Sequence, residues 1–325
     1  MKRSLVIFYS QTGQMKEIVD SVTAPLGEDF ELVFEELRPV PPYPFPWRGM
    51  PFFQAFPESV QEIPCLLEPF QFNPDQDFDL VILGYQVWYL SPSIPFTAFL
   101  QSPEARKVLK GKPVITILGV RNMWVMAQER VKRQIRDLGG RLVGNIVMVD
   151  PHPNLVSVVT IGRWLMKGEQ KGKGLIHGIF PQAGVPEQNI REAAKFGEVI
   201  RGAFRAGQLD TLQDQLLNKG AVKIKPVLMN IEKRGRMMFG FWSKFVLKKG
   251  AYGDPEREGR LKLFQWYLLV VIYLASPIVS LVFWFTHKIF YKRTWRSLEY
   301  YSHVESSIIK PGKMSARGAS DLIYL

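Results

Sequence analysis

Five short apolar runs, separated by segments with helical spacing, constrain the fold of this chain more than any other feature. The runs are rich in β-branched and aromatic residues, which is typical of strands buried in a parallel sheet. The predicted strands are Leu5–Tyr9, Phe30–Glu35, Leu80–Gly84, Val114–Gly119 and Val143–Val149. Strand and helix patterns that alternate in this way predict a doubly wound α/β domain with a five-stranded parallel sheet over residues 1–205.

Helical patterns follow these strands, and two insertions interrupt the alternation. The predicted helices are Met15–Thr23, Pro95–Leu100, Val125–Leu138 and Asn189–Phe204. The first insertion, residues 39–78, holds ten prolines between Pro39 and Pro74 and many aromatic residues. This composition predicts an extended or looped segment that packs over the domain as an apolar cover. The second insertion, residues 151–186, is predicted to be irregular, with His152 and His177 as hydrogen-bonded structural residues.

The loop between the first strand and the first helix is a candidate phosphate site. It consists of Ser10, Gln11, Thr12, Gly13 and Gln14. Backbone N–H groups at a helix N-terminus lack intrahelical partners and carry the positive end of the helix dipole, and the two hydroxyls add donors. The glycine spacing fits neither a G-x-G-x-x-G dinucleotide loop nor a Walker loop. The loop therefore predicts binding of a phosphate in a different setting.

The loops after the third and fourth strands complete the predicted site. In an open parallel sheet, ligands bind beyond the carboxyl ends of the strands at the topological switch point, so these loops should adjoin the phosphate loop. Their aromatic side chains offer flat surfaces for a planar ring, so the combination predicts flavin mononucleotide (FMN) as cofactor. The predicted cofactor-binding residues in these loops are Tyr85, Gln86, Val87, Trp88, Tyr89, Asn122 and Trp124. Arg121 and Tyr89 are the candidate catalytic residues.

The positive charge of the chain is concentrated in its C-terminal third. Residues 1–200 hold 21 Lys plus Arg and 21 Asp plus Glu, whereas residues 201–325 hold 21 and 9. Such asymmetry indicates nucleic acid or a membrane surface. The neighbouring run Leu263–Phe285 has no charge over 23 residues, about 34 Å as a helix against a hydrocarbon core of about 30 Å. This run favours the membrane over nucleic acid.

The sequence therefore predicts a membrane-associated helical segment after the α/β domain. Residues 206–262 form a basic amphipathic linker, residues 263–286 an apolar membrane segment and residues 287–325 a basic tail. Pro277 permits either a spanning or a re-entrant segment, and a buried core helix is the alternative. Within the linker, the aromatics and lysines of residues 237–249 predict an interfacial helix.

Several stretches resemble known proteins. Ser10, Thr12 and Gly13 match the S/T-x-T-G-x-T phosphate loop of the flavodoxin-like superfamily, with Met15 at the last position. The strings "FYSQTGQMKEIVDSV", "PVPPYPFPWRGMPFFQAFPESVQEIPC", "DLVILGYQVWYLSPSIPFTAFLQS" and "ITILGVRNMWVMAQERVKRQI" resemble one branch of that superfamily, the dialkylresorcinol condensing enzymes. That resemblance implies aromatisation of a cyclised product in the synthesis of aryl lipids and flexirubin-type pigments, beside a ketosynthase and an acyl carrier protein.

The resemblance and the chemistry together predict an FMN-dependent oxidation of a dialkylcyclohexanedione to a dialkylresorcinol. No side chain can accept the two electrons, so a cofactor is required. Two alternatives remain open, namely a generic flavin reductase or electron carrier and a flavin-less membrane scaffold. The substrate is expected to carry alkyl chains, and the domain to lie at the cytoplasmic face of the membrane, where a homodimer is possible. The one cysteine, Cys65, excludes an internal disulfide and any multi-cysteine metal site, and no metal is expected.

Overall fold

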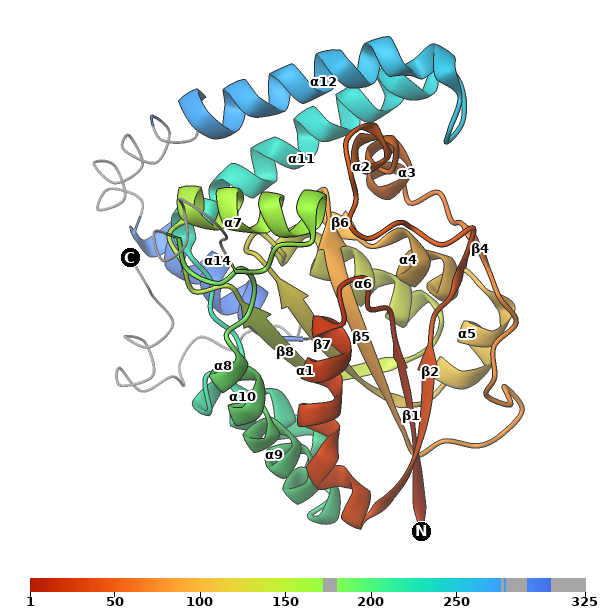
Figure 1. The fold of residues 1–325 in the computed structure, drawn as a ribbon. Helices are drawn as coiled ribbons and strands as arrows, with labels where there is room; N and C mark the ends of the chain where they lie inside the picture. The colour runs from red at the N-terminus through yellow and green to blue at the C-terminus, as the bar shows by residue number, and fades with distance from the viewer. Residues whose placement is uncertain (172–179, 276–277, 279–290, 305–325) are drawn as a thin grey trace.

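A parallel sheet forms the centre of the protein. The computed structural model describes residues 1–171, 180–275, 278 and 291–304 of the 325-residue chain. The five parallel strands are β1 (Lys2–Phe8), β2 (Phe30–Glu36), β5 (Leu80–Trp88), β7 (Pro113–Val120) and β8 (Arg141–Val149). They lie in the order β2-β1-β5-β7-β8 (Figure 1). Taken along the chain this is 2-1-3-4-5, the flavodoxin-like order. The predicted five-stranded, doubly wound sheet is therefore confirmed, with each predicted strand in place.

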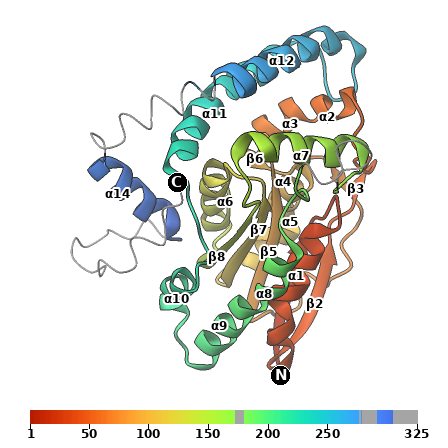
Figure 2. The ribbon, with the colours of Figure 1, turned by 60° about the vertical axis from the view of Figure 1, so that its left-hand side comes forward.

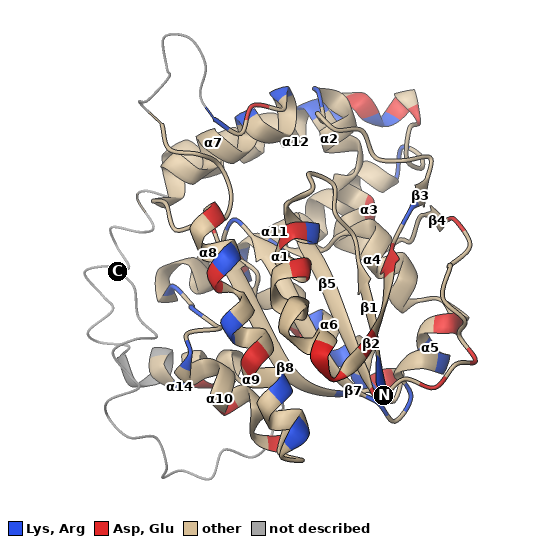
Figure 3. Ribbon diagram, turned by 60° about the horizontal axis from the view of Figure 1, so that its bottom comes forward, with Lys and Arg blue, Asp and Glu red and all other residues tan. Residues whose placement is uncertain are grey.

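Helices cover both faces of the sheet, so its inner strands are buried on both sides, whereas the edge strand β2 is partly exposed (Figure 2). In β1, Leu5 and Ile7 pack into the core on one face, and Val6 and Phe8 into the core on the other. The first face is covered by α4 (Ile94–Leu100), α5 (Pro103–Leu109) and α6 (Val125–Asp137). The second is covered by α1 (Gln14–Thr23), α8 (Glu187–Glu192), α9 (Ala194–Arg205) and α10 (Leu212–Asn218). The central strands β5 and β7 carry no charged residue (Figure 3).

Three of the predicted helices are confirmed as α1, α4 and α6, and the fourth needs a correction. The predicted single helix over Asn189–Phe204 is two helices, α8 and α9, which meet at Ala193. The short connecting elements are the 3₁₀ turns η1 (Ala24–Glu28), η3 (Leu209–Thr211) and η4 (Pro255–Arg257), and strand β6 (Ser91–Pro92), which pairs with the end of β5.

The first insertion contains helices that the sequence analysis did not predict. Strands β3 (Pro39–Val40) and β4 (Leu66–Leu67) form a small antiparallel pair, and α2 (Met50–Gln54) and α3 (Phe56–Gln61) lie between them. The prediction of a looped segment is therefore wrong for residues 50–61. Each short helix has a proline in its first turn, where the missing N–H costs nothing because it would have no intrahelical partner.

The second insertion also contains a helix, so the prediction that it is irregular is wrong for α7 (Asn154–Lys167). The buried residues of α7 are Ser157, Thr160 and Trp164. Their spacing is helical, but two of the three are small and polar. The buried face of α7 therefore has no apolar periodicity that would predict a helix. His152 contacts the Asp150 carboxylate through Nδ1 at 2.6 Å, as expected of a structural residue. His177 lies outside the described residues.

The C-terminal third packs onto the first insertion. It contains α11 (Pro226–Leu247), α12 (Glu258–Val270), a π-helical turn (Val271–Ala275) that continues α12, and α14 (Tyr291–Ser302). Arg257, before α12, forms a buried double hydrogen bond with the Glu58 carboxylate of α3, at 2.6 and 2.9 Å. Phe264 of α12 stacks on Phe56 of α3, with ring centroids 3.6 Å apart. Residues 206–262, predicted as a linker, therefore belong to the packed fold.

The predicted membrane segment, residues 263–286, is described only in part, because residues 276–277 and 279–290 lie outside the described residues. Its first part continues α12, where Phe264 is buried against α3. Among the described residues, no helix is both long and apolar enough to cross a bilayer.

Candidate functional site

The predicted phosphate loop lies where β1 ends and α1 begins. Gly13 immediately precedes α1 with a left-handed φ of 86°, a conformation that side chains disfavour, and it is exposed. The Ser10 hydroxyl accepts a hydrogen bond from the backbone amide of Lys16 at 3.2 Å. Among the described residues, the backbone amides of residues 11–15 find no acceptor. These amides and the helix dipole make a concave donor surface of the kind that binds anions.

The side chains of the two glutamines in this loop form hydrogen bonds with the two insertions and do not point into the space where a phosphate would bind. Gln11 donates from Nε2 to the carbonyl oxygen of Pro44 at 3.2 Å. Gln14 donates from Nε2 to the carbonyl oxygen of Val185 and accepts from the Val185 amide, at 3.1 and 2.9 Å. Both insertions are therefore fastened to the edges of the phosphate loop.

Met15, which replaces the hydroxyl residue of the family motif, is a core residue. Its side chain is buried on the α1 side of the sheet. A Cβ atom built on Gly84 would lie 3.2 Å from Met15 Cε, and one built on Gly119 would lie 3.3 Å from Met15 Sδ. Met15 thus packs in the core beside these two glycines, together with Val19 and Ile18, so this side chain takes no part in the anion-binding surface.

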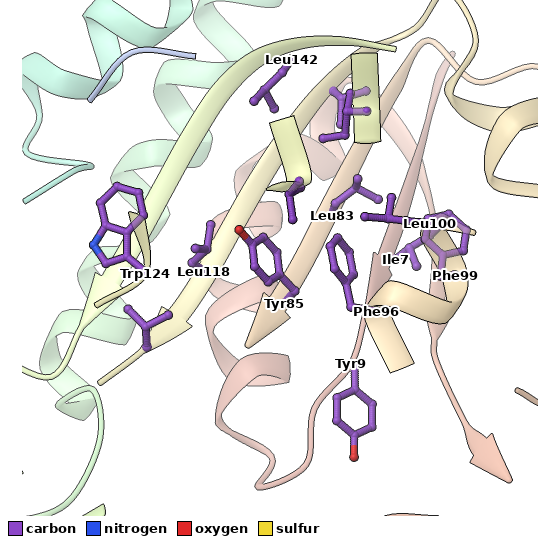
Figure 4. Packing of buried hydrophobic residues seen from close by; sticks show 14 of the residues in the cluster. Ile7, Tyr9, Leu83, Tyr85, Phe96, Phe99, Leu100, Leu118, Trp124 and Leu142 are labelled. Atoms are coloured by element: carbon purple, nitrogen blue, oxygen red, sulfur yellow. The ribbon is translucent and has the colours of Figure 1, made fainter. Parts of the chain in front are cut away.

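The predicted cofactor-binding residues at the end of β5 and in the loop after it lie in different surroundings. Tyr85 is fully buried, stacks on Phe96 with ring centroids 4.5 Å apart, and donates its hydroxyl to Gln128 Oε1 at 2.5 Å (Figure 4). It is a core residue of the α4–α6 side of the sheet. Gln86 donates from Nε2 to the Tyr9 carbonyl oxygen at 3.3 Å, and Val87 pairs with Pro92 of β6.

Trp88 and Tyr89 follow Val87 and pack in different parts of one connected set of aromatic residues. Trp88 contacts Tyr9, Tyr43 and Trp47 next to the phosphate loop, with centroids 4.7 to 5.7 Å from its own ring. Tyr89, in a strained left-handed conformation with φ of 49°, donates its hydroxyl to the carbonyl oxygen of Phe52 at 2.7 Å. Its ring packs against aromatic residues of α3, α11 and α12. Of the two, Trp88 is the one that the structure places beside the phosphate loop.

The loop after β7 is held by the N-terminus of α7. Arg121 donates from one guanidinium nitrogen to the backbone and side-chain oxygens of Asn154 at 3.2 and 2.9 Å, and Asn122 donates from Nδ2 to the same side-chain oxygen at 2.8 Å. Burial lowers the pKa of Arg121 to about 10, against the opposing effect of the Asp150 carboxylate, so the guanidinium stays protonated at neutral pH. Asn154 is a positioning residue that the sequence analysis missed, because it lies inside a helix that was not predicted.

The other end of α7 lies against the first insertion. The Trp47 amide donates to the Leu165 carbonyl oxygen at 2.6 Å, and the rings of Phe45 and Trp164 meet edge to face. In Figure 1, α7 crosses the carboxyl ends of the central strands. Together with the first insertion it covers the edge of the sheet at which the three predicted loops meet, which limits the access of water to that edge.

Burial also suppresses the ionisation of Tyr9, which follows β1, and of Tyr43 and Cys65 in the first insertion. It raises the pKa values of Tyr9 and Tyr43 above their usual range and that of the Cys65 thiol to about 11. Cys65 is therefore protonated at neutral pH, and it lacks the thiolate character of a nucleophile.

A cavity of about 380 Å³ adjoins the loop after β7. Of the predicted cofactor-binding residues, Asn122 and Trp124 line it, and it extends toward α11, where Glu232 lies. Glu232 is 1 % exposed and accepts a hydrogen bond from the Met126 amide at 2.7 Å. Glu232 could not be found from local sequence patterns, since its partner Met126 is 106 residues earlier in the chain.

Comparison with known proteins finds similarity only at the level of solved structures. No protein-family model and no curated protein sequence matches the chain. A flavoprotein from Bacteroides eggerthii is 18% identical with a TM-score of 0.37, over 46% of this chain and 89% of that one. A Lactobacillus acidophilus flavoprotein solved in complex with FMN is 15% identical with a TM-score of 0.38, over 50% and 99%. Oxidised flavodoxin 1 from Bacillus cereus is 12% identical with a TM-score of 0.33, over 61% and 95%. At these values the similarity assigns no function, and the flavodoxin-like fold rests on the strand order.

Proposed function

We propose that this protein is an FMN-binding oxidoreductase whose cofactor lies at the carboxyl edge of the sheet. The observation that carries the proposal is the loop 10–14, whose free backbone amides, left-handed glycine and helix dipole lie at the switch point of a 2-1-3-4-5 sheet.

The side chains around the loop fit a phosphorylated aromatic cofactor. The amides of residues 11–15 would hold the phosphate, with the hydroxyls of Ser10 and Thr12 beside them. Trp88, next to the loop, would flank the ring, and Arg121 would place a fixed positive charge near the substrate. When bound, FMN would supply the two-electron acceptor that side chains lack.

The finer proposal is oxidation of a dialkylcyclohexane-1,3-dione to a dialkylresorcinol. The substrate loses two hydrogens, one as a hydride to the oxidised cofactor and one as a proton, and the ring becomes aromatic. Two features support an apolar, alkylated substrate, namely the aromatic cover formed by residues 43–56 and the motifs that resemble dialkylresorcinol condensing enzymes. A generic flavin reductase would use the same loops with a nicotinamide as donor, and an electron carrier would also use them, although Arg121 beside the site differs from the acidic surround expected of a carrier.

We also propose that the protein docks on the cytoplasmic face of a membrane, beside a ketosynthase and an acyl carrier protein. The supporting feature is a set of exposed apolar side chains on α11 and α12. Met237 and Phe241 of α11 are 70% and 64% exposed, and Trp266 of α12 is 68% exposed. Leu263 and Val270 lie on the same side of α12 as Trp266 by helical spacing, and Leu274 in the π-helical turn that follows is 63% exposed. The exposed Lys244, Lys248 and Lys262 on these helices and in the turn between them would favour an anionic surface.

The absorbance spectrum of the purified full-length protein tests the cofactor proposal directly. We expect the visible bands of oxidised flavin, either as purified or after addition of FMN and removal of the excess. Conversion of a dialkylcyclohexanedione to the resorcinol, followed by mass spectrometry, then separates the aromatase from a generic reductase, which would instead oxidise a nicotinamide. A folded protein that takes up no flavin would leave the membrane scaffold as the remaining function.

A further inference from the structure

A basic groove runs along one face of α11. Its walls come from the end of α3, from α6 and α11, and from Tyr301 at the end of α14, and its volume is about 730 Å³. The residues of α11 that line it recur every three or four positions and therefore share one face of the helix. They are Lys233, Arg236, Met237, Gly240 and Lys244.

The groove carries more positive charge than its carboxylate can balance. Its cationic side chains are Arg130, Lys233, Arg236 and Lys244, and Glu62 is the one carboxylate among the described residues that line it. Both Glu62 oxygens are already engaged by α6, since Oε1 pairs with Arg130 at 2.7 Å and Oε2 accepts from Gln134 Nε2 at 3.1 Å. Within the described parts of the chain, the side chains of Arg236 and Lys244 form no ion pair. The groove should therefore attract an anion.

Arg130 fixes one of these charges in the wall of the groove. Its side chain is 9% exposed, and Nη1 donates to the Val60 carbonyl oxygen at 2.9 Å and to Ser91 Oγ at 3.0 Å. Burial lowers the pKa of Arg130, the Glu62 carboxylate opposes this effect, and the charge of Arg236 lowers the pKa further. A partly buried charge is screened less by salt than an exposed one, so Arg130 strengthens the attraction for an anion in the groove.

The rim of the groove joins the exposed apolar side chains of α11. Met237 lines the groove and is 70% exposed, and Phe241, one turn further along the helix, is 64% exposed. A Cβ atom built on Gly240 would meet no described atom within 4 Å, so the middle of the groove is open. A ligand with its anionic group among the cations therefore has room to extend an alkyl chain over Met237 toward Phe241. An anionic lipid at a membrane surface has this combination of groups.

We propose that this groove binds the phosphomonoester of an anionic amphiphile such as phosphatidic acid, with the phosphate beside Arg236 and Lys233 and near the buried Arg130. A phosphomonoester carries about −1.5 to −2 charges at neutral pH, more than the single charge of a phosphodiester, so it gains more from several cations. The fork of an arginine guanidinium also matches the geometry of phosphate oxygens. The inference rests on the proposed membrane docking and names the lipid that the docked protein would recognise.

The test uses the full-length protein and phosphatidylcholine vesicles that contain either phosphatidic acid or phosphatidylserine, adjusted to equal zeta potential. Cosedimentation gives both affinities, and we expect phosphatidic acid vesicles to bind about tenfold more tightly. Arg236→Gln should reduce this preference to about twofold or less. The matched control Arg234→Gln removes the same charge from an exposed position of α11 that does not line the groove, and it should leave the preference unchanged.

A second variant fills the groove without changing its charge. Gly240→Leu adds a side chain where the Cβ meets open space, so it should abolish the preference for phosphatidic acid and retain binding to phosphatidylserine vesicles. Leucine is a better helix former than glycine, so the variant is expected to fold. Gly202→Leu on α9, where the Cβ also meets open space, is the control and should keep the preference.

Soluble probes separate a lipid from a free phosphate ester. Dihexanoyl phosphatidic acid should compete with the vesicles, and glycerol 3-phosphate, which has no alkyl chain, should compete about tenfold less well or worse. Equal affinity for the two kinds of vesicle, an unchanged preference in Arg236→Gln and Gly240→Leu, or equal competition by glycerol 3-phosphate would overturn the inference. The absence of binding to either kind of vesicle would refute the docking, and direct binding of dihexanoyl phosphatidic acid would then retain the groove by itself.

Discussion

The sheet and the helical layer formed by α2, α3, α11 and α12 are stabilised in different ways. The sheet core is mainly aliphatic, closed on both faces, and its central strands carry no charge. The helical layer has an aromatic core centred on Phe56 and Phe264, includes the buried ion pair Arg257–Glu58, and leaves the outer side of α11 and α12 apolar and exposed. The sheet core is therefore closed mainly by its own helices, although Met229 of α11 also packs into it, whereas the helical layer includes a buried ion pair and has a surface suited to a further partner.

The largest expected effect comes from removing that ion pair. Arg257→Leu leaves the Glu58 carboxylate buried without its partner, which typically costs about 3 to 5 kcal/mol. We expect faster hydrogen exchange in α3, α11 and α12, while the sheet stays protected. The control Arg141→Leu removes an exposed pair with Asp210 and should cost at most about 1 kcal/mol. Loss of protection in the sheet to the same extent would show that the two regions unfold as one unit.

A pH titration tests the contact between α11 of the helical layer and α6, which covers the sheet. Burial raises the pKa of Glu232 from 4.5 to about 7, so the folded protein holds a proton that the unfolded chain releases between these values. Stability should therefore fall as the pH rises from about 4.5 to about 7, by up to about 3 kcal/mol, and this contribution should level off above pH 7. Urea unfolding at pH 5 and pH 8 measures it. Glu232→Gln should reduce the difference, and an identical pH dependence in the variant would contradict the assignment.

The exposed surface of the helical layer should affect membrane binding and not folding. Phe241→Ser and Trp266→Ser should each weaken binding to phosphatidylserine-containing vesicles by about 2 kcal/mol, because each side chain loses apolar area that the bilayer would bury. The matched control Leu66→Ser removes an apolar side chain that is also exposed, on β4. Cosedimentation at low and high salt gives the affinities. A wild-type protein that remains in the supernatant under both conditions would refute the docking surface.

The smallest expected effect is on the affinity for FMN, and it tests the loop 10–14 at the carboxyl edge of the sheet. Gly13→Val meets no atom within 4 Å at its Cβ, so its consequences arise from the left-handed φ and from the bulk placed before the free amides. We expect FMN affinity to fall by about 1.5 kcal/mol, or at least tenfold. Gly27→Val, which also meets open space but has no positive φ, controls for the general effect of valine on the fold. Unchanged FMN occupancy in the folded Gly13→Val protein would remove this loop from the site.

The two regions also differ in how far the sequence predicts them. All five parallel strands could be located. Four of them are largely apolar runs buried on both faces, which need no knowledge of their neighbours, whereas β2 lies at the edge of the sheet and mixes apolar residues with glutamates. Helices α2, α3 and α7 could not, since prolines and small polar residues obscure their patterns and their stability comes from distant partners. Arg257 and Glu58 are 199 residues apart in the chain, and no local pattern connects them.

The candidate site shows the same division. The loop 10–14 could be predicted because its position between a strand and a helix is local information. That Tyr85 is a core residue could not be predicted, because an aromatic residue after a strand has the same sequence signal in a core and in a binding site. Asn154 and Glu232 were missed for a different reason, since each acts across the fold on a loop that is distant in the chain.

Met15 has a consequence for how such a loop can change over generations. The methionine packs beside Gly84 and Gly119, where an added Cβ would lie 3.2 and 3.3 Å from it, and Val19 and Ile18 would lie closer still, at 2.7 and 3.0 Å. A mutation of Met15 to threonine would introduce the hydroxyl of the superfamily motif but would leave a cavity in the core, and a larger residue at 119 could not fill that cavity without moving Ile18. A single step toward the motif is therefore expected to destabilise the fold.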